Sequence, residues 1–277
     1  MADLRIACFG DVVGAPGLRA FAHGAKVLRD AGRVDLVIVN GENSKNGSGI
    51  SPEGCKELRR AGADAITLGD HVFKDRKICD DLDDPIKPIA RPANLSSGAR
   101  GKRVSRVMMN SEQMEKFPPV FVVTVLGRLF MPLPANDPFE AVDREVAAVA
   151  QAEPRALVIV EVHAEATSEK QAMVWHCARK WPGRVVLVFG THTHVQTADA
   201  RIVNGSLAAV SDLGMCGGHR GVIGRKIDPV LEMMTNQNPF PYEVADEDVK
   251  ATGIVVGIDT EARKAISIET ISIAAPA

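Results

Sequence analysis

Short apolar segments of strand character alternate with helix-like segments along the chain, and this alternation constrains the fold more than any other feature. Strand-like runs occupy residues 4–9, 36–40, 65–68, 120–126, 156–161 and 185–190. Helix-like stretches lie between several of them, at residues 18–31, 52–61, 138–150 and 168–180, and two of these begin with proline. The alternation is typical of βαβ units and predicts a layered α/β fold.

The pattern changes after residue 200. Residues 201–203 and 207–210 are strand-like and flank Asn204-Gly205, which predicts a two-residue hairpin because Asn-Gly readily adopts the positive φ angles of a type I′ turn. A second hairpin is expected between residues 254–258 and 265–273. We therefore expect antiparallel late strands, and two packed sheets, within one domain.

The domain organisation is predicted from composition. The chain has 277 residues, of which 45% are hydrophobic and 25% charged, enough to bury a sizeable core without disulfides. It contains no linker-like tract, repeat or low-complexity segment, so residues 1–277 are expected to form a single domain. The least regular part, residues 91–116, is expected to be a loop or a small excursion over the site.

Charge and cysteine content exclude several classes of protein. A formal net charge of -2 gives no long-range attraction for polyanions, so stable nucleic-acid binding is not expected, although a local basic pocket is left open. The five cysteines are an odd number with no Cys-x-x-Cys pair, which favours a reducing, cytoplasmic setting. No export signal or membrane-spanning run is visible, so no membrane association is expected.

Five of the predicted strands end in residues with oxygen or imidazole side chains. The segments are Gly10-Asp11, Asn40-Gly41-Glu42-Asn43, Gly69-Asp70-His71, His163-Ala164-Glu165 and Gly190-Thr191-His192-Thr193-His194. In α/β sheets, ligands bind beyond the carboxyl ends of the strands, so these side chains should meet on one face of the molecule. Their convergence is the strongest functional signal in the sequence.

Each signal taken singly has a structural alternative. Asp11 is equally suited to capping a helix, and His163 to forming a hydrogen bond in the core. Glu42 and Asn43 are also compatible with a turn. His192 and His194 favour metal binding, because residues two apart in an extended segment point the same way and can reach one metal cluster.

The donor set indicates the kind of metal. Carboxylates, an amide and imidazoles together suit divalent zinc, manganese or iron better than calcium, which prefers oxygen ligands alone. Two ions bridged by one carboxylate would polarise phosphate oxygens and make hydroxide from bound water near neutral pH. The pattern therefore predicts hydrolysis of a phosphoryl ester by a metal-bridged hydroxide.

His71 directly follows the candidate ligand Asp70, so its side chain can point toward a substrate rather than toward the metals. A histidine there could donate the proton that a leaving alkoxide needs. The alternative is that His71 only orients Asp70.

These motifs resemble those of the calcineurin-like metallophosphoesterases, and most closely the YmdB-type branch. The branch motifs are Gly-Asp-Val-Val-Gly-x-Pro-Gly, Asn-Gly-Glu-Asn, His-Ala-Glu-Ala-Thr-Ser-Glu-Lys and Gly-Thr-His-Thr-His-Val-Gln-Thr-Ala-Asp. They stand here nearly unbroken at residues 10–17, 40–43, 163–170 and 190–199, and Arg91-Pro92-Ala93-Asn94 also matches. The resemblance covers almost the whole chain.

The resemblance implies a four-layer sandwich of two mixed β-sheets flanked by helices, with a binuclear metal centre of iron or manganese, or else zinc. It also implies phosphodiesterase activity on small cyclic nucleotides, notably 2′,3′-cyclic ones. It assigns Glu42 as the bridging ligand and His71 as the proton donor. The implied metal ligands are Asp11, Glu42, Asn43, Asp70, His163, His192 and His194.

Two positions need comment beside this resemblance. The family usually has asparagine where this chain has Asp70, and the added negative charge should hold divalent ions more tightly and could lower the electrophilicity of the metal pair. Cys216 lies in a glycine-rich segment that also resembles the family, and is expected to be a buried core residue rather than a thiol beside the metals.

Two further functions are weighed against the phosphodiesterase. A binuclear amidohydrolase also uses His-x-His, but its barrel places that pair after the first strand and needs eight βα units, which are absent here. A regulatory metal-binding protein with weak or vestigial phosphoesterase activity would act through a partner; His71 disfavours it and Asp70 leaves room for it. The resemblance leaves self-association open.

Overall fold

A seven-stranded mixed sheet forms one half of the protein in the computed structural model, which describes residues 3–238 and 241–276. Its strand order is β2-β11-β12-β1-β3-β4, and β13 pairs with β12. The strands are β1 (Asp3–Phe9), β2 (Asp11–Val12), β3 (Leu36–Asn40), β4 (Ala65–Thr67), β11 (Met215–Gly218), β12 (Val249–Asp259) and β13 (Lys264–Ala274). β1, β3 and β4 run parallel, whereas β12 is antiparallel to β1, β11 and β13.

A six-stranded sheet with the order β5-β6-β7-β8-β10-β9 forms the other half. Its strands are β5 (Val104–Arg106), β6 (Val120–Leu126), β7 (Leu157–His163), β8 (Val185–Thr191), β9 (Arg201–Val203) and β10 (Leu207–Val210). The four central strands are parallel, and both edge strands are antiparallel to their neighbours. The two sheets are therefore both mixed, as the sequence predicts.

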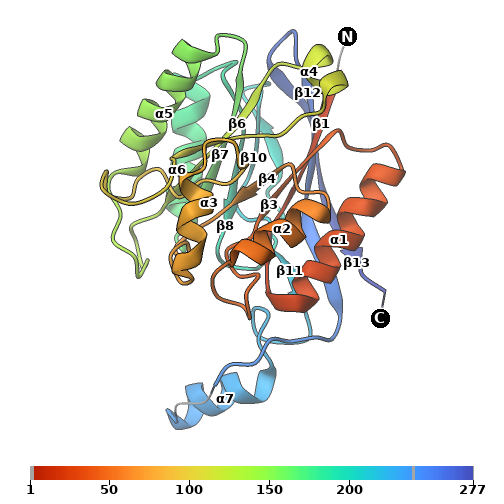
Figure 1. The fold of residues 1–277 in the computed structure, drawn as a ribbon, viewed down its shortest axis with the longest axis vertical. Coiled ribbons are helices and arrows are strands. Elements are labelled where there is room, and N and C mark those ends of the chain that lie inside the picture. The colour runs from red at the N-terminus through yellow and green to blue at the C-terminus, as the bar shows by residue number, and fades with distance from the viewer. Residues whose placement is uncertain (1–2, 239–240, 277) are drawn as a thin grey trace.

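Helices cover the outer face of each sheet (Figure 1). The helices are α1 (Gly14–Asp30), α2 (Pro52–Arg60), the 3₁₀ helix η1 (Arg76–Ile78), α3 (Cys79–Asp83), α4 (Ser111–Lys116), α5 (Pro138–Ala152), α6 (Thr167–Lys180) and α7 (Ile227–Asn236). The first sheet is covered by α1 and α2, and the second by α5 and α6.

Three hydrophobic cores fill the spaces between these layers. Alternate residues of β1 point to opposite faces, so Phe9 packs with Phe21 of α1 while Ile6 packs between the two sheets with Ile159. A third core joins the second sheet to α5 and α6. The resulting order of helix, sheet, sheet and helix confirms the predicted four-layer α/β fold.

The predicted elements lie close to the observed ones, with two differences. Helix α1 begins at Gly14 rather than at residue 18, because Pro16 is well suited to a first helical turn. In the predicted hairpin, Asn204 and Gly205 have φ angles of 50° and 67°, as expected. Val203 pairs with Leu207, however, so Ser206 adds a third residue to the loop.

The segment at residues 91–116 contains β5 and α4. Arg91 is buried within it and donates a hydrogen bond to the carbonyl oxygen of Pro92 at 2.8 Å, which fixes the chain locally. The organisation of residues 1–277 as a single domain, with an excursion over the site at residues 91–116, stays a prediction.

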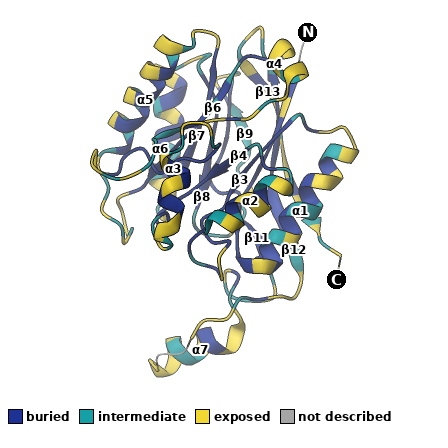
Figure 2. Ribbon diagram, in the orientation of Figure 1, coloured by how far each residue is buried: buried dark blue, intermediate teal, exposed yellow. Residues whose placement is uncertain are grey.

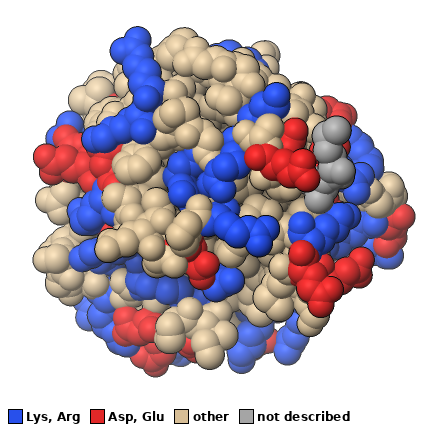
Figure 3. All heavy atoms as spheres, turned by 90° about the horizontal axis from the view of Figure 1, so that it is seen from above, with Lys and Arg blue, Asp and Glu red and all other residues tan. Residues whose placement is uncertain are grey.

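Burial is highest in the sheets, whereas α7 extends away from the body of the protein and most of its residues are exposed (Figures 1 and 2). Figure 3 looks onto the opposite end, where basic side chains gather near the middle of a face that also carries acidic and uncharged ones. Within residues 3–238 and 241–276, no helix has the length and apolar character needed to span a membrane.

Candidate metal centre

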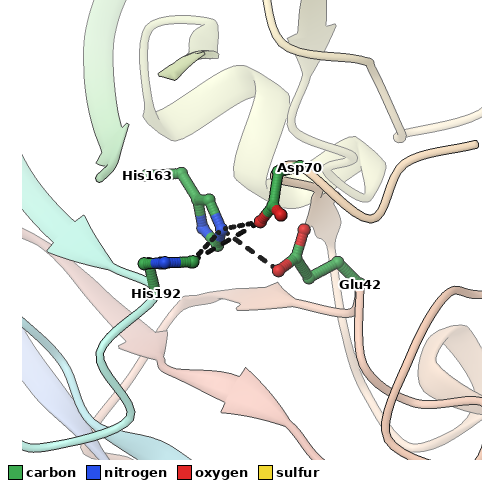
Figure 4. A group of neighbouring side chains, drawn as sticks. All are labelled: Glu42, Asp70, His163 and His192. Atoms are coloured by element: carbon green, nitrogen blue, oxygen red, sulfur yellow. Dashed lines mark hydrogen bonds and ion pairs between the residues drawn. The ribbon is translucent and has the colours of Figure 1, made fainter. Parts of the chain in front are cut away.

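Four predicted ligands from both sheets meet in one cluster, which we call the His163 cluster: Glu42, Asp70, His163 and His192 (Figure 4). Glu42 and Asp70 follow β3 and β4 of the first sheet, whereas His163 ends β7 and His192 follows β8 of the second. One donor atom from each residue lies within 4.8 Å of all the others. The geometry suits a cation bound between the two sheets.

The imidazole of His163 is the centre of this cluster. Its Nε2 atom lies 3.0 Å from Asp70 Oδ1, 3.1 Å from Glu42 Oε1 and 3.1 Å from His192 Nδ1. Gly69 permits this approach, because a Cβ atom there would overlap the imidazole ring. The glycine before Asp70 is thus required by the packing of His163.

Three further predicted ligands form a neighbouring group, which we call the Asp11 cluster: Asp11, Asn43 and His194. Asn43 Nδ2 lies 3.2 Å from His194 Nε2, and the latter lies 3.8 Å from Asp11 Oδ1. Asp11 Oδ1 is buried, and no described residue forms a hydrogen bond to it. A buried carboxylate oxygen without a partner is costly, and a bound cation would satisfy it.

Asp11 does not cap the helix that follows it. The N-cap residue of α1 is Val13, which forms no side-chain capping bond, and Asp11 Oδ2 instead accepts a hydrogen bond from His192 N at 3.2 Å. Asp11 therefore joins the two clusters through the loop after β8.

The expected extended geometry of residues 192–194 is wrong. Strand β8 ends at Thr191, and His192 and His194 have φ angles of 98° and 65°. The irregular backbone separates the two rings, so that His192 faces the His163 cluster and His194 the Asp11 cluster. Both imidazoles still reach one site, through a turn rather than through a strand.

Two buried polar groups hold this turn in place. Lys170 of α6 forms an ion pair of 2.7 Å with Asp212, and their side chains are only 3% and 1% exposed. Asp212 Oδ2 also accepts hydrogen bonds from the backbone and the hydroxyl of Thr193, at 3.3 and 2.9 Å. Thr193, which lies between the two histidines, is thereby connected through Asp212 to Lys170 of α6.

A buried hydrogen-bond network fixes the ring of His163. Thr191 Oγ1 lies 2.9 Å from His163 Nδ1 and 2.6 Å from Glu161 Oε1, and it donates its hydroxyl proton to the carboxylate. It therefore accepts a bond from Nδ1–H, which leaves Nε2 as the atom facing the cluster. Glu161 is held in turn by Asn40 and Thr124, at 2.8 and 3.0 Å.

The ionisation of the two clusters differs. Burial opposes charge on Glu42 and on Asp70, but hydrogen bonds and charge from His163 outweigh it and lower the pKa of both. Burial also opposes charge on His163, which by itself would lower the pKa of the imidazole. The charge of Glu42 and the hydrogen bond to Asp70 nevertheless raise that pKa well above its usual range. A proton on His163 thus supplies the positive charge that this cluster needs.

In the Asp11 cluster, burial dominates. It raises the pKa of Asp11 to about 8, although the charge of His163 acts in the opposite direction. It also lowers the pKa of His194, which keeps that imidazole neutral and able to bind a cation.

His71 lies at the edge of the site and is partly exposed. Its backbone N–H donates to Glu42 Oε2 at 3.1 Å, and its Nδ1 lies 2.6 Å from Asn43 Oδ1. The ring is thereby oriented, with Nε2 3.8 Å from Asp70 Oδ2. Because Asn43 Oδ1 faces His71, cation binding through that oxygen requires the amide to rotate.

Comparisons with known proteins agree with this arrangement. The family model described as YmdB-like protein matches residues 7–271. The chain belongs to the YmdB-like family.

Relatives of this YmdB-like chain align over nearly its full length. It is 36% identical to the 2′,3′-cyclic-nucleotide 2′-phosphodiesterase of Bacillus subtilis (strain 168), with 98% of this chain and 97% of the relative covered. Among crystal structures, a hypothetical protein from Thermus thermophilus superposes with a TM-score of 0.84 at 34% identity, covering 99% of this chain and all of the other. A novel phosphatase from Mycoplasma pneumoniae superposes with a TM-score of 0.86 at 29% identity, covering 99% and 94%.

The supporting roles of several residues around this YmdB-like site were not predicted, although Asn40 and Thr191 stand in the strand-end segments named from the sequence. These supporting residues are Asn40, Thr124, Glu161, Lys170, Thr191 and Asp212. A signal existed for two of them, because Thr124 and Glu161 interrupt otherwise apolar strands. Cys216, by contrast, is a buried core residue as expected, and burial raises its pKa.

Proposed function

We propose that this protein is a metal-dependent phosphodiesterase that hydrolyses small cyclic nucleotides of the 2′,3′-cyclic type. The observation that carries the proposal is the pair of adjoining clusters, with a buried carboxylate oxygen of Asp11 that has no partner among the described residues. Membership of the YmdB-like family and the name of the Bacillus subtilis relative support the reaction class.

The proposed centre holds two divalent ions, of iron or manganese, or else zinc. Asp70, His163 and His192 would hold one ion, and Asp11, Asn43 and His194 the other. Glu42 would bridge them, because its Oε1 atom lies 3.1 Å from His163 Nε2 and 3.5 Å from Asn43 Nδ2. Bound as a pair, such ions polarise phosphate oxygens and lower the pKa of bound water.

The chain's own contribution to the reaction is orientation and proton transfer. Hydrolysis adds water across the phosphorus–oxygen bond to the 2′ oxygen, which leaves as an alkoxide and needs a proton. We assign that transfer to His71, because its backbone N–H donates to Glu42 and its Nε2 atom lies 3.8 Å from Asp70 Oδ2, while the side chain stays 29% exposed to a substrate.

The test of the reaction is to measure bound metals per chain by elemental analysis and to assay the same sample with 2′,3′-cyclic AMP. About two ions with metal-dependent turnover are expected. Two ions without turnover, after reconstitution with manganese, iron and zinc in turn, would instead favour the regulatory metal-binding protein.

The role of His71 is tested by His71→Ala. Turnover should fall by roughly 10²- to 10⁴-fold, the usual contribution of a positioned acid, while the metal content stays unchanged. His23→Ala, at a partly exposed site on α1, is the matched control and should keep full activity. A His71→Ala enzyme that works at full rate would refute the assignment.

Partners and location follow the same reasoning. We infer a small-molecule substrate rather than a stable complex with nucleic acid, in keeping with the net charge of -2. Self-association and a cytoplasmic location stay predictions.

A further inference from the structure

A cavity of about 300 Å³ opens beside His71, at the edge of the His163 cluster. It is lined by Asp70, His71, Phe73, Lys74, Pro132 and Leu133. Its volume is at the lower end of the range for small-molecule sites, roughly 300 to 1,000 Å³. The cavity can therefore take a single planar group, but not a length of polynucleotide.

The proposed reaction determines which part of the substrate lies in this cavity. The oxygen that leaves phosphorus remains attached to the rest of the substrate, and it must approach the group that protonates it. If His71 is that group, the part of the substrate that carries the leaving oxygen extends from His71, and the adjoining space is this cavity. For a cyclic nucleotide, that part is the nucleoside.

The walls suit a nucleobase. Phe73 contributes an aromatic ring, while Pro132 and Leu133 contribute apolar surface. Rings of this kind stack on bases irrespective of sequence, since every base has a flat face. Lys74 adds a positive charge, and its ammonium forms no ion pair with a carboxylate of residues 3–238 or 241–276. An anionic phosphodiester would be attracted to such a wall.

The wall formed by Pro132 and Leu133 is held at both ends. These residues belong to the loop at 127–137, where the backbone N–H of Arg128 donates to Glu169 Oε1 of α6 at 2.8 Å. At the other end, Asn136 N donates to the carbonyl oxygen of Asn94 at 2.8 Å. Leu133 and Phe73 both pack against the core beneath the first sheet. The cavity is therefore preformed, which lowers the cost of binding.

We infer that this cavity is the binding site for the leaving side of the substrate, and that Phe73 determines specificity for phosphodiesters whose leaving side carries an aromatic base. The inference rests on the proposed function, because it takes His71 as the proton donor. It adds a residue that selects the substrate: through Phe73, nucleoside cyclic phosphates should be preferred over aliphatic esters that contain the same reactive ring.

The experiment compares 2′,3′-cyclic AMP with ethylene phosphate, which has the same five-membered cyclic phosphodiester but no nucleoside. Phe73→Leu keeps apolar bulk but removes the flat ring, Phe73→Tyr keeps the ring, and Phe121→Leu is a control at a partly buried phenylalanine packed against the core under α5 and α6. For each protein, kcat/KM is measured with both esters, and the Kd of adenosine 3′-monophosphate is measured by calorimetry.

Phe73→Leu should lower kcat/KM for 2′,3′-cyclic AMP by roughly 5- to 150-fold, the effect of losing one stacked base, and should weaken adenosine 3′-monophosphate similarly. Ethylene phosphate should be hydrolysed as before, and Phe73→Tyr and Phe121→Leu should match the parent. An equal fall with both esters would mean that Phe73 only supports the fold, and would overturn the inference.

Failure of the proposed function gives a different result. A parent protein that hydrolyses neither ester, yet binds adenosine 3′-monophosphate more tightly than Phe73→Leu does, would leave the cavity as a nucleoside site without the reaction. Binding that is absent, or insensitive to Phe73, would overturn the inference itself.

Discussion

The two halves of the candidate centre achieve electrical balance in different ways. In the His163 cluster, the imidazole of His163 lies within 3.1 Å of two carboxylates, lowers the pKa of both, and has its own pKa raised by them. In the Asp11 cluster no protonated side chain of the described residues forms a hydrogen bond to the carboxylate, and burial raises the pKa of Asp11 to about 8. The His163 cluster thus favours a proton on the imidazole of His163, whereas the Asp11 cluster favours a proton on the carboxyl group of Asp11. A cation that binds to either half must displace that proton.

Glu42 is the side chain that connects the two halves, so its loss should have the largest effect. Glu42→Gln should lower turnover by about 10³-fold or more, because each ion contributes several kcal/mol of charge stabilisation, and at least one ion should be lost per chain. Elemental analysis and turnover measure this. Glu57→Gln, at an exposed position on α2, is the control, and an unchanged metal count in Glu42→Gln would refute the bridging role.

Asp70→Asn should separate the halves. Removing one negative charge near a divalent ion should weaken its binding in the His163 cluster by on the order of 10²-fold, within the roughly 1 to 4 kcal/mol expected for unit charges 4 Å apart. Turnover per loaded centre should rise, because the metal pair becomes more electrophilic. Metal titration followed by assay at saturation tests both. Equal weakening of both ions would contradict the division into two clusters.

The pH dependence of metal binding tests where the protons are held. Below about pH 8, the Asp11 cluster should lose affinity by roughly tenfold per pH unit, because one proton must leave Asp11 for each ion bound, and above it this dependence should vanish. Calorimetry in buffers of different ionisation enthalpy counts the protons. At pH 7 we expect about one proton from each cluster, and one fewer in Asp11→Asn. The same count in both proteins would show that Asp11 is already ionised.

The smallest effect is expected at the support of His163. Thr191→Val removes the hydroxyl that receives Nδ1–H, and should weaken the ion in the His163 cluster by about tenfold, the lower end of the range for groups that orient a ligand. Thr124→Val loses a bond to the same Glu161 but does not touch His163, so it is a matched control. Equal effects of the two changes would assign the role to Glu161 rather than to the ring orientation.

Much of the fold could be predicted because local pattern and tertiary structure agree. The apolar runs became β1, β3, β6, β7 and β8, and Pro52 and Pro138 do begin α2 and α5. The short strands β2 and β11 could not be foreseen, because each is formed by pairing with a distant segment rather than by its own sequence.

The sequence predicted that these side chains converge, but not the geometry in which they do so. Residues that follow the carboxyl ends of neighbouring parallel strands are expected to lie close together. The seven predicted ligands do lie in two adjoining clusters. The turn at His192 to His194 depends on a buried ion pair between Lys170 and Asp212, which are 42 residues apart. Such a contact leaves no local pattern, so the sequence could not distinguish an extended segment from a turn.

The strand order of the first sheet has a consequence for biosynthesis. Asp11 lies in β2, which pairs with β11, and β11 is joined to β1 only through β12 at Val249–Asp259. A nascent chain that has exposed every other ligand therefore still lacks the framework that positions Asp11. We therefore expect the two clusters to be completed only after β12 has been synthesised and paired with β1, so an unfinished chain would not yet offer the proposed two-ion site to whichever ion is most abundant in the cell.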